Sequence, residues 1–404
     1  MTPGLSPLIS IVIPTRDRPE FAALALQALT RQSFTDFEVI VSDNAIRRPF
    51  QPDSRLFDGV RFRYLRPPKP VWMTDHWEFA VSHARGCYVG VLGDKSVLVP
   101  DALERVAAEI MKGSPDAVSW RMGVCQPSGA DLAGPCVAAI RTTPDTSAES
   151  VPPREALEYL LATYLNPSFE ADHQLEIRGS IYHGVFSSTL IRAMKERFGR
   201  VFRFYAPDLN AQCAAMQIAR EVSHIRRSLE LVMAGPSNGV AIGQTVGTFL
   251  STQNEAADGA SALSQRLIPN LSASVSHRLA SDLVALSGRT LSTEQWVELH
   301  RRAAFDLCDT SGWPDRSLRR SQWAALSSSA ARFAPEVRFQ ILRAKWDARR
   351  SKAKRFVTEE LRRRFGTGVE ALRQLVFAKR DAAIDKRPFD HLFAALDAIA
   401  ASGR

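Results

Sequence analysis

The stretch GCYVGVLGDKSVLVPDAL, which spans residues 86–103, decides the fold of this chain. Its apolar run Tyr88–Leu92 has the length and composition of a strand buried on both faces, and Gly93 allows a sharp turn after it. Asp94 then follows at the carboxyl end of that strand. Ligands bind at this edge of open α/β sheets, so the triplet Asp94-Lys95-Ser96 is the first candidate site.

Strand and helix patterns alternate around this stretch. The predicted strands are Ile9–Ile13, Val39–Val41, Val60–Leu65, Cys87–Leu92 and Ala117–Trp120, and the predicted helices are Pro19–Arg31, Trp72–Ala84 and Asp101–Lys112. Turn residues within Ser119–Ile140 predict a hairpin excursion. The alternation indicates an α/β fold with a mainly parallel sheet covered by helices on both faces.

The pattern changes in the second half of the chain. A polar, proline-punctuated connection covers Pro144–Pro153, and Ser180–Ser187 is the clearest remaining strand candidate. Beyond about Gly247 the pattern is almost wholly helical. We therefore predict one domain over residues 1–246 and a helical, basic region over residues 247–404.

Composition narrows the class of protein. Of the 404 residues, 45% are hydrophobic and 24% are charged, as in ordinary globular proteins. The five cysteines are scattered without CxxC pairs, which favours a reducing compartment over a zinc site or a disulfide framework. No apolar run approaches the roughly 20 residues that cross a bilayer, and Met1–Pro7 lacks the features of a signal peptide. We expect a cytoplasmic protein.

The formal net charge of +9 is concentrated near the C-terminus, because Ile341–Phe365 holds ten Lys or Arg and three Asp or Glu. Apolar residues at near-helical spacing, among them Leu342 and Trp346, make this a basic amphipathic helix. Such a helix is either a solvated face or a surface for anionic lipid. Nucleic-acid binding is not indicated, since no recognised motif accompanies the charge.

Polar side chains follow two predicted strands. The segment SIVIPTRDRP, Ser10–Pro19, puts Thr15 in the first strand-to-helix turn, and FEVIVSDNA, Phe37–Ala45, brings Asp43 to the matching strand end. Two adjacent polar strand ends form one cleft, in which a carboxylate can accept from a base N–H or a ribose hydroxyl. Alternatively, Thr15 caps a helix and Asp43 shapes an Asx-turn.

The order PTRDRP, EVIVSDN and WMTDHWEFAVSHARGCYVGVLGDKSVLVPDAL resembles the donor-binding half of family 2 glycosyltransferases of the bacterial surface-polysaccharide type, with the GT-A fold. The resemblance covers roughly the first 110 residues. It implies a Rossmann-like domain with a donor-binding half over 1–120 and an acceptor half over 121–246. It also implies a nucleotide-diphosphate sugar donor, inversion at the anomeric carbon, and Mg²⁺ or Mn²⁺ on an acidic DxD triplet. The donor-binding residues would be Pro14, Thr15, Arg16, Arg18, Asp43, Asn44, His76, Asp94, Lys95 and His183.

The triplet departs from this family pattern. Asp94 keeps the first acidic position and is the one metal ligand that the resemblance implies, but Ser96 replaces the last carboxylate. Lys95 brings the local charge to about zero, which weakens attraction for a divalent cation. Lys95 can instead face the leaving diphosphate, assisted by Arg16 or Arg18. Metal-independent donor binding and loss of activity both remain open.

A weaker resemblance continues in GSIYHGVFSSTLI, residues 179–191, and FRFYAPDLNAQCAAM, residues 202–216. The resemblance implies that a carboxylate from this part of the fold deprotonates the acceptor hydroxyl. Asp208 is the predicted general base, because Pro207-Asp208 opens a helix at a loop-to-helix junction. The alternative is a plain helix N-cap, and the two roles are compatible. His183 either contacts the donor phosphate or acceptor, or is a hydrogen-bonded core residue.

These inferences predict an inverting, hexosyltransferase-type glycosyltransferase of cell-surface polysaccharide synthesis. The acceptor would be a saccharide or a lipid-linked saccharide, and the basic helix would hold the protein on the inner face of the membrane. The main alternative is a catalytically degenerate GT-A domain that acts as a binding or scaffolding protein. A nucleotidyltransferase is a third reading, because it also uses an α/β nucleotide cleft.

Overall fold

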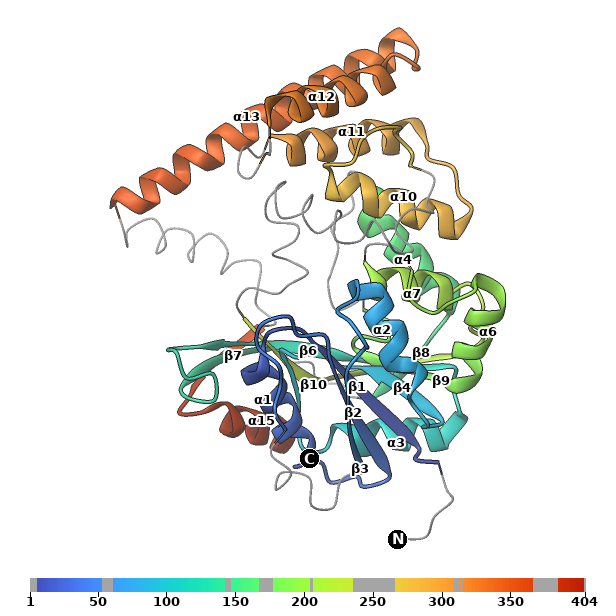
Figure 1. Cartoon of the computed structure of the whole chain (residues 1–404), viewed down its shortest axis with the longest axis vertical. Helices are drawn as coiled ribbons and strands as arrows, with labels where there is room; N and C mark the ends of the chain where they lie inside the picture. Colours follow the sequence, from blue (N-terminus) through green and yellow to red (C-terminus); the bar gives the residue numbers. More distant parts are fainter. Residues whose placement is uncertain are drawn as a thin grey trace. The chain divides into compact units, whose positions relative to one another are not determined.

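The computed structural model describes residues 6–52, 61–141, 147–166, 177–203, 206–234, 266–308, 313, 315–365 and 384–402 (Figure 1). The chain forms two compact units. Unit 1 comprises Met1–Leu160, Ala171–Gly235 and Ile384–Arg404, and unit 2 comprises Leu161–Glu170 and Pro236–Ala383.

The first part of unit 1 is a parallel sheet. Its strands are β1 (Ile9–Thr15), β2 (Phe37–Asp43), β3 (Arg61–Leu65) and β4 (Tyr88–Val91), in the spatial order β3-β2-β1-β4. They alternate with α1 (Pro19–Leu29), α2 (Met73–Ser82) and α3 (Ala102–Gly113). The strand and helix alternation predicted from the sequence is therefore confirmed over these elements.

The rest of the sheet is mixed. Strand β9 (Gly184–Ser187) runs antiparallel between β4 and β6 (Ala117–Pro127), and β7 (Cys136–Arg141) forms the predicted hairpin with β6. Strand β10 (Val222–Met233) lies parallel to β6 and antiparallel to β5 (Ser96–Leu98) and β8 (Ala148–Val151). Three helices, α4 (Pro153–Leu165), α6 (Ser188–Phe198) and α7 (Pro207–Ala215), lie between these strands in the sequence. The α/β fold class is confirmed, with its parallel pairing mainly among β1 to β4.

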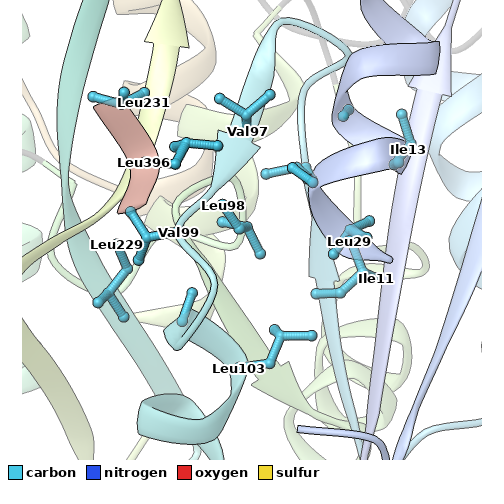
Figure 2. Close-up of a cluster of buried hydrophobic side chains, with 14 of the residues drawn as sticks. Ile11, Ile13, Leu29, Val97, Leu98, Val99, Leu103, Leu229, Leu231 and Leu396 are labelled. Carbon is cyan, nitrogen blue, oxygen red and sulfur yellow. The ribbon is translucent and has the colours of Figure 1, made fainter. Parts of the chain in front are cut away.

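The central strands are buried on both faces, as their apolar composition predicts. In β1, Ile9, Ile11 and Ile13 belong to a core shared with α1, α3 and α15 (Leu392–Ala401), whereas the fully buried Val12 lies outside that core. Alternate residues of a strand point to opposite faces, which explains this division. Figure 2 shows Leu29 of α1, Leu98 of β5, Leu231 of β10 and Leu396 of α15 in this core.

The last residues correct one expectation. The sequence predicts an almost wholly helical pattern beyond about Gly247, but Ile384–Phe389 forms β11, which pairs antiparallel with β7. Helix α15 then packs into the core of unit 1, and Arg227 Nη2 donates to the Ile399 carbonyl at 2.7 Å. The charged sequence of β11 does not have the apolar pattern of a strand. Its strand conformation depends on pairing with β7, which is distant in the sequence.

Unit 2 contains the helices that the sequence predicts there. They are α10 (Val275–Ser287), α11 (Thr293–Leu307), α12 (Arg316–Ala330) and α13 (Pro335–Phe365). Ser292 forms a capping box with Gln295 at the start of α11, and Ser274 caps α10. Within the described ranges, no helix combines the length and the apolar composition needed to span a membrane.

Candidate active site

Three predicted polar residues lie at one edge of the parallel sheet. Thr15 and Asp43 are register partners at the carboxyl ends of β1 and β2, and the Asn44 amide donates to the Thr15 carbonyl at 2.9 Å. Asp94 follows β4, the other neighbour of β1. Pro14 lies within β1 as a buried residue, one position before Thr15. Parallel strands thus bring together residues that are far apart in the sequence.

Asp94 is held by two other site residues. The Thr15 hydroxyl donates to Oδ2 at 3.0 Å, and Arg18 Nη2 donates to Oδ1 at 2.5 Å. Asp94 is only 4% exposed. Burial raises the pKa of its carboxyl above the usual range, although Arg18, Thr15 and Lys95 oppose that shift. Asp94 is therefore a buried carboxylate already paired with a side-chain cation.

These donors do not fit a divalent cation. Mg²⁺ requires oxygen ligands, but the guanidinium of Arg18 and the ammonium of Lys95 surround Asp94, and Ser96 is fully buried. In the ranges that the structure describes, no group of three or more His, Cys, Asp or Glu side chains is arranged to hold a metal ion. The positive charge at this edge comes from the chain itself.

Lys95 lies beside this pair and is 8% exposed. Burial and the charge of Arg18 lower the pKa of its ammonium, while Asp94 opposes that shift. Arg18 keeps 20% of its side chain exposed, and Arg16 is half-buried on the same turn. Of the two predicted cations of the strand-to-helix turn, Arg18 thus lies at the triplet, whereas the charge of Arg16 acts on Asp17 and His76.

The carboxylate of Asp43 organises the loop after β2. It accepts hydrogen bonds from the backbone amides of Ala45 at 2.9 Å and Phe50 at 2.8 Å, and from the Tyr64 hydroxyl at 2.9 Å. Burial and this last hydrogen bond raise the pKa of Tyr64 to about 12. The bond to Ala45 is the Asx-turn considered from the sequence. Donor binding by Asp43 stays a prediction.

Two further side chains hold the surrounding loops. The Asn44 side chain donates to the Val71 carbonyl at 2.7 Å and accepts from the Val71 backbone amide at 2.9 Å.

Asp17, which was not among the predicted site residues, accepts from the backbone amides of Ile46, Arg47 and Arg48 at 3.0, 2.7 and 2.8 Å. Burial opposes the effect, but these three amides lower the pKa of Asp17. Its positive φ of 57° marks a turn that sequence periodicity does not reveal.

His76 lies deeper than its predicted role suggested. Its side chain is buried, and its Nε2 is 2.8 Å from the Ser42 hydroxyl. Burial lowers the pKa of His76 to about 4, so the imidazole is neutral at physiological pH. This contact gives His76 a structural role below β2, and donor binding by His76 stays a prediction.

Tyr182 links the two halves of the site. A Cβ added at Gly93 would collide with its hydroxyl, and its ring stacks on Trp77 with centroids 5.5 Å apart. Burial, followed by the charges of Asp94, Glu230 and Asp208, raises the pKa of Tyr182. The charges of three carboxylates from separate parts of unit 1 therefore act on one phenol. The small residue at position 93 was the sequence signal for this close approach.

Asp208 lies in the first turn of α7, directly after Pro207. The helix N-cap is Ala206, so the N-cap alternative for Asp208 is wrong. Asp208 is half-buried and acts electrostatically on Tyr182. A general-base role for Asp208 stays a prediction.

His183 pairs with a carboxylate that the sequence reasoning missed. Its Nδ1 is 3.0 Å from Oε2 of Glu230, and the same oxygen accepts from Nε1 of Trp120 at 2.9 Å. Glu230 is fully buried. Burial opposes ionisation, but the charge of His183 and the donors around the carboxylate lower the pKa of Glu230. A lone acid in the apolar run SLELVM, residues 228–233, was the available signal.

The family model decides the class of the first part of the chain. Residues 10–133 match glycosyl transferase family 2. This match confirms the resemblance to family 2 that the three motifs indicated, whereas the surface-polysaccharide type and the altered triplet stay predictions. It supports a glycosyl-transfer role and nucleotide-sugar binding for the segment that contains Thr15, Asp43 and Asp94.

Solved structures resemble the fold at low sequence identity. TarS from S. aureus is 14% identical with a TM-score of 0.45, over 85% of this chain and 54% of that chain. TarS 1–349 in complex with UDP-GlcNAc is 12% identical with a TM-score of 0.43, over 87% and 92%. The mannosyltransferase PcManGT from Pyrobaculum calidifontis, in complex with GDP-Man and Mn²⁺, is 14% identical with a TM-score of 0.38, over 86% and 88%.

The chain thus spans about half the length of the longer TarS structure. A comparison with curated proteins finds no match.

Proposed function

We propose that this protein is an inverting glycosyltransferase that moves a sugar, of the hexose type, from a nucleotide-diphosphate donor to an acceptor hydroxyl. The observation that carries the proposal is the family 2 match over residues 10–133, within which Thr15, Asp43 and Asp94 lie at one sheet edge. This edge is where nucleotides bind in open α/β sheets.

The chemistry is a single displacement. Asp208 accepts the proton of the acceptor hydroxyl, and the oxygen forms a bond to the anomeric carbon as the bond from that carbon to the diphosphate oxygen breaks. The electron pair leaves with the nucleoside diphosphate, so the configuration inverts. Lys95 and Arg18 supply positive charge for the leaving diphosphate, a role supported by their closeness to Asp94.

We place the acceptor among cell-surface saccharides, with the protein on an anionic membrane face. Helix α13 supports this location, because Phe339, Leu342 and Trp346 are 67%, 51% and 58% exposed at helical spacing. The guanidinium of Arg350 lies 5.3 Å from the centroid of the Trp346 ring. Exposed aromatic residues beside arginines suit the headgroup region of an anionic bilayer.

Vesicle binding tests that location. The protein should sediment with phosphatidylserine-containing vesicles at low salt and be released at high salt, because the charge attraction is screened. Replacing Trp346 by Ala should weaken binding more than replacing the exposed Met111 of α3. Absence of vesicle binding at low salt would remove the membrane part of the proposal.

A degenerate GT-A scaffold is the second candidate. The observation in its favour is the Arg18–Asp94 pair, which occupies the first acidic position of the triplet. A scaffold would bind its ligand without turning it over, so the rate of nucleoside-diphosphate release distinguishes the two functions.

The deciding experiment is release of nucleoside diphosphate from UDP-, GDP- and dTDP-sugars, in the presence of Mn²⁺ or of EDTA. Asp208→Asn should reduce release by about 100-fold or more, since general-base groups contribute 10²–10⁴ in rate. Glu196→Gln on the exposed face of α6 is the matched control and should leave release unchanged. Release that survives Asp208→Asn would remove that residue as the base, and no release from any donor would favour the scaffold.

A further inference from the structure

We propose that Glu230 takes the place of the missing third acid of the triplet, and that it holds a protonated His183 where a family member would hold a divalent cation. This inference rests on the proposed nucleotide-sugar site and extends it to a residue outside the triplet.

Strand pairing brings Glu230 to the triplet. Strands β5 and β10 are antiparallel, with Ser96 opposite Val232 and Leu98 opposite Glu230. Residues two apart on a strand share a face, so Ser96 and Glu230 are diagonal neighbours on the same side. The Ser96 hydroxyl lies close enough to help lower the pKa of Glu230, although the two side chains form no well-aligned hydrogen bond. The carboxylate absent from position 96 is thus replaced across the strand pair.

This carboxylate already has an ionisable partner, His183. Glu230 is fully buried, and its Oε2 lies 3.0 Å from Nδ1 of His183 and 2.9 Å from Nε1 of Trp120. A buried carboxylate without a compensating charge is costly, so Glu230 favours the protonated imidazole.

Charges of both signs lie near Tyr182 and Asp94, next to the pair in the sequence or in the site. Asp94 and Asp208 contribute negative charge, Arg18 and Lys95 contribute positive charge, and the neutral phenol of Tyr182 lies among them. The Tyr182 ring meets the His183 ring edge-on, with centroids 4.9 Å apart. In a DxD site, two carboxylates would share one divalent cation. Here Asp94 is paired with Arg18 and Glu230 is paired with His183.

The arrangement predicts how nucleotides bind. The positive charge facing a diphosphate is built into the chain, so binding needs no added metal. Binding should weaken as the pH rises through the pKa of His183, because deprotonation removes one of these cations. A purely structural hydrogen bond from a neutral His183 would produce no such pH dependence.

The first test is calorimetric titration of the full chain with UDP, GDP and dTDP in EDTA, from pH 6 to pH 9. We expect binding in EDTA, a loss of at least 10-fold in affinity for His183→Gln, and a flattened pH profile in that variant. The side-chain amide of Gln retains a donor, so it separates charge from packing, and thermal melting of the variant checks its fold. Wild-type affinity for His183→Gln with an intact pH profile would overturn the inference.

Two readouts do not depend on turnover. The imidazole ¹⁵N shifts of the eight histidines can be assigned through His183→Gln. They should show that His183 keeps its proton to a higher pH than an ordinary histidine, and Glu230→Gln should lower the pH at which this proton is lost. In the His183→Gln background, Ser96→Asp should create Mn²⁺ binding detectable by paramagnetic resonance, whereas Ser96→Asn should not. A neutral His183 at pH 6 would overturn the inference.

The failure of this inference is distinct from failure of the proposed function. Nucleotide binding that requires Mn²⁺ in the wild type would overturn the cation replacement but keep the donor site. No binding of any nucleotide, with or without Mn²⁺, would overturn both.

Discussion

Arg18 and Asp94 form an ion pair at 2.5 Å between the first strand-to-helix turn and the loop after β4. The pair joins two motifs of the donor-binding half, and it leaves Asp94 only 4% exposed. Because the cation is a side chain, the stability of the fold and the charge of the site depend on the same residue.

Arg18→Gln should therefore destabilise the protein. Removing the guanidinium leaves Asp94 buried with the Thr15 hydroxyl as its remaining described hydrogen-bond donor, which should lower the free energy of unfolding by about 1–3 kcal/mol. Arg48→Gln is the control, because Arg48 and its partner Glu20 are both more than half exposed, and exposed pairs contribute about 1 kcal/mol or less. Urea unfolding of both variants measures the difference, and equal losses would argue against a special role for the pair.

The close approach of Gly93 to Tyr182 should be sensitive to one methyl group. In Gly93→Ala, the new Cβ would collide with the Tyr182 hydroxyl, so nucleotide-diphosphate release and thermal stability should both fall. Tyr182→Phe removes that oxygen and should partly restore the double variant. Gly129→Ala, where a Cβ meets nothing within 4 Å, is the control. A double variant no better than Gly93→Ala would place the strain elsewhere.

The C-terminal helix should be required for the stability of unit 1. Leu396 is 1% exposed in the core that α15 shares with β10, so Leu396→Ala should cost about 2–5 kcal/mol. Met111→Ala is a control at a side chain that is 72% exposed. Denaturant unfolding checks both variants. Leu396→Ala with wild-type stability would show that α15 does not belong to this core in solution.

Because of Lys345, the free energy of unfolding of unit 2 should be higher at alkaline pH than near neutral pH. Burial lowers its pKa to about 8, and its Nζ donates a hydrogen bond to the Ser327 hydroxyl at 3.3 Å. The unfolded chain keeps this proton up to a pKa of about 10.4. Between these values the unfolded state binds more protons, so the free energy of unfolding rises with pH.

The check is urea unfolding between pH 7.5 and pH 10, followed by signals from unit 2. Lys345→Met should remove the part of the pH dependence that comes from this residue and raise stability at pH 7.5. Lys112→Met, at a side chain that is 74% exposed, should leave the pH dependence unchanged. Identical slopes for the wild type and Lys345→Met would contradict a buried, depressed lysine.

Much of the donor half follows from local sequence. Apolar runs such as Ile9–Ile13 and Tyr88–Leu92 predict strands buried on both faces, because side-chain alternation and composition are local properties. Parallel strands align their carboxyl ends, so the closeness of Thr15, Asp43 and Asp94 also follows from the sequence. Pro207 likewise marks the start of α7 without any tertiary information.

The sequence by itself thus determined the α/β class and the order of the polar strand ends, because those depend on short-range periodicity, and its motifs indicated the family that the match over residues 10–133 supports. Only the tertiary structure decided that Arg18 pairs with Asp94, that Glu230 lies near Ser96, and that β11 pairs with β7. Each of these relationships joins residues from distant elements through strand register or side-chain direction. Register and direction are set by the packing of the whole core, which no local pattern encodes.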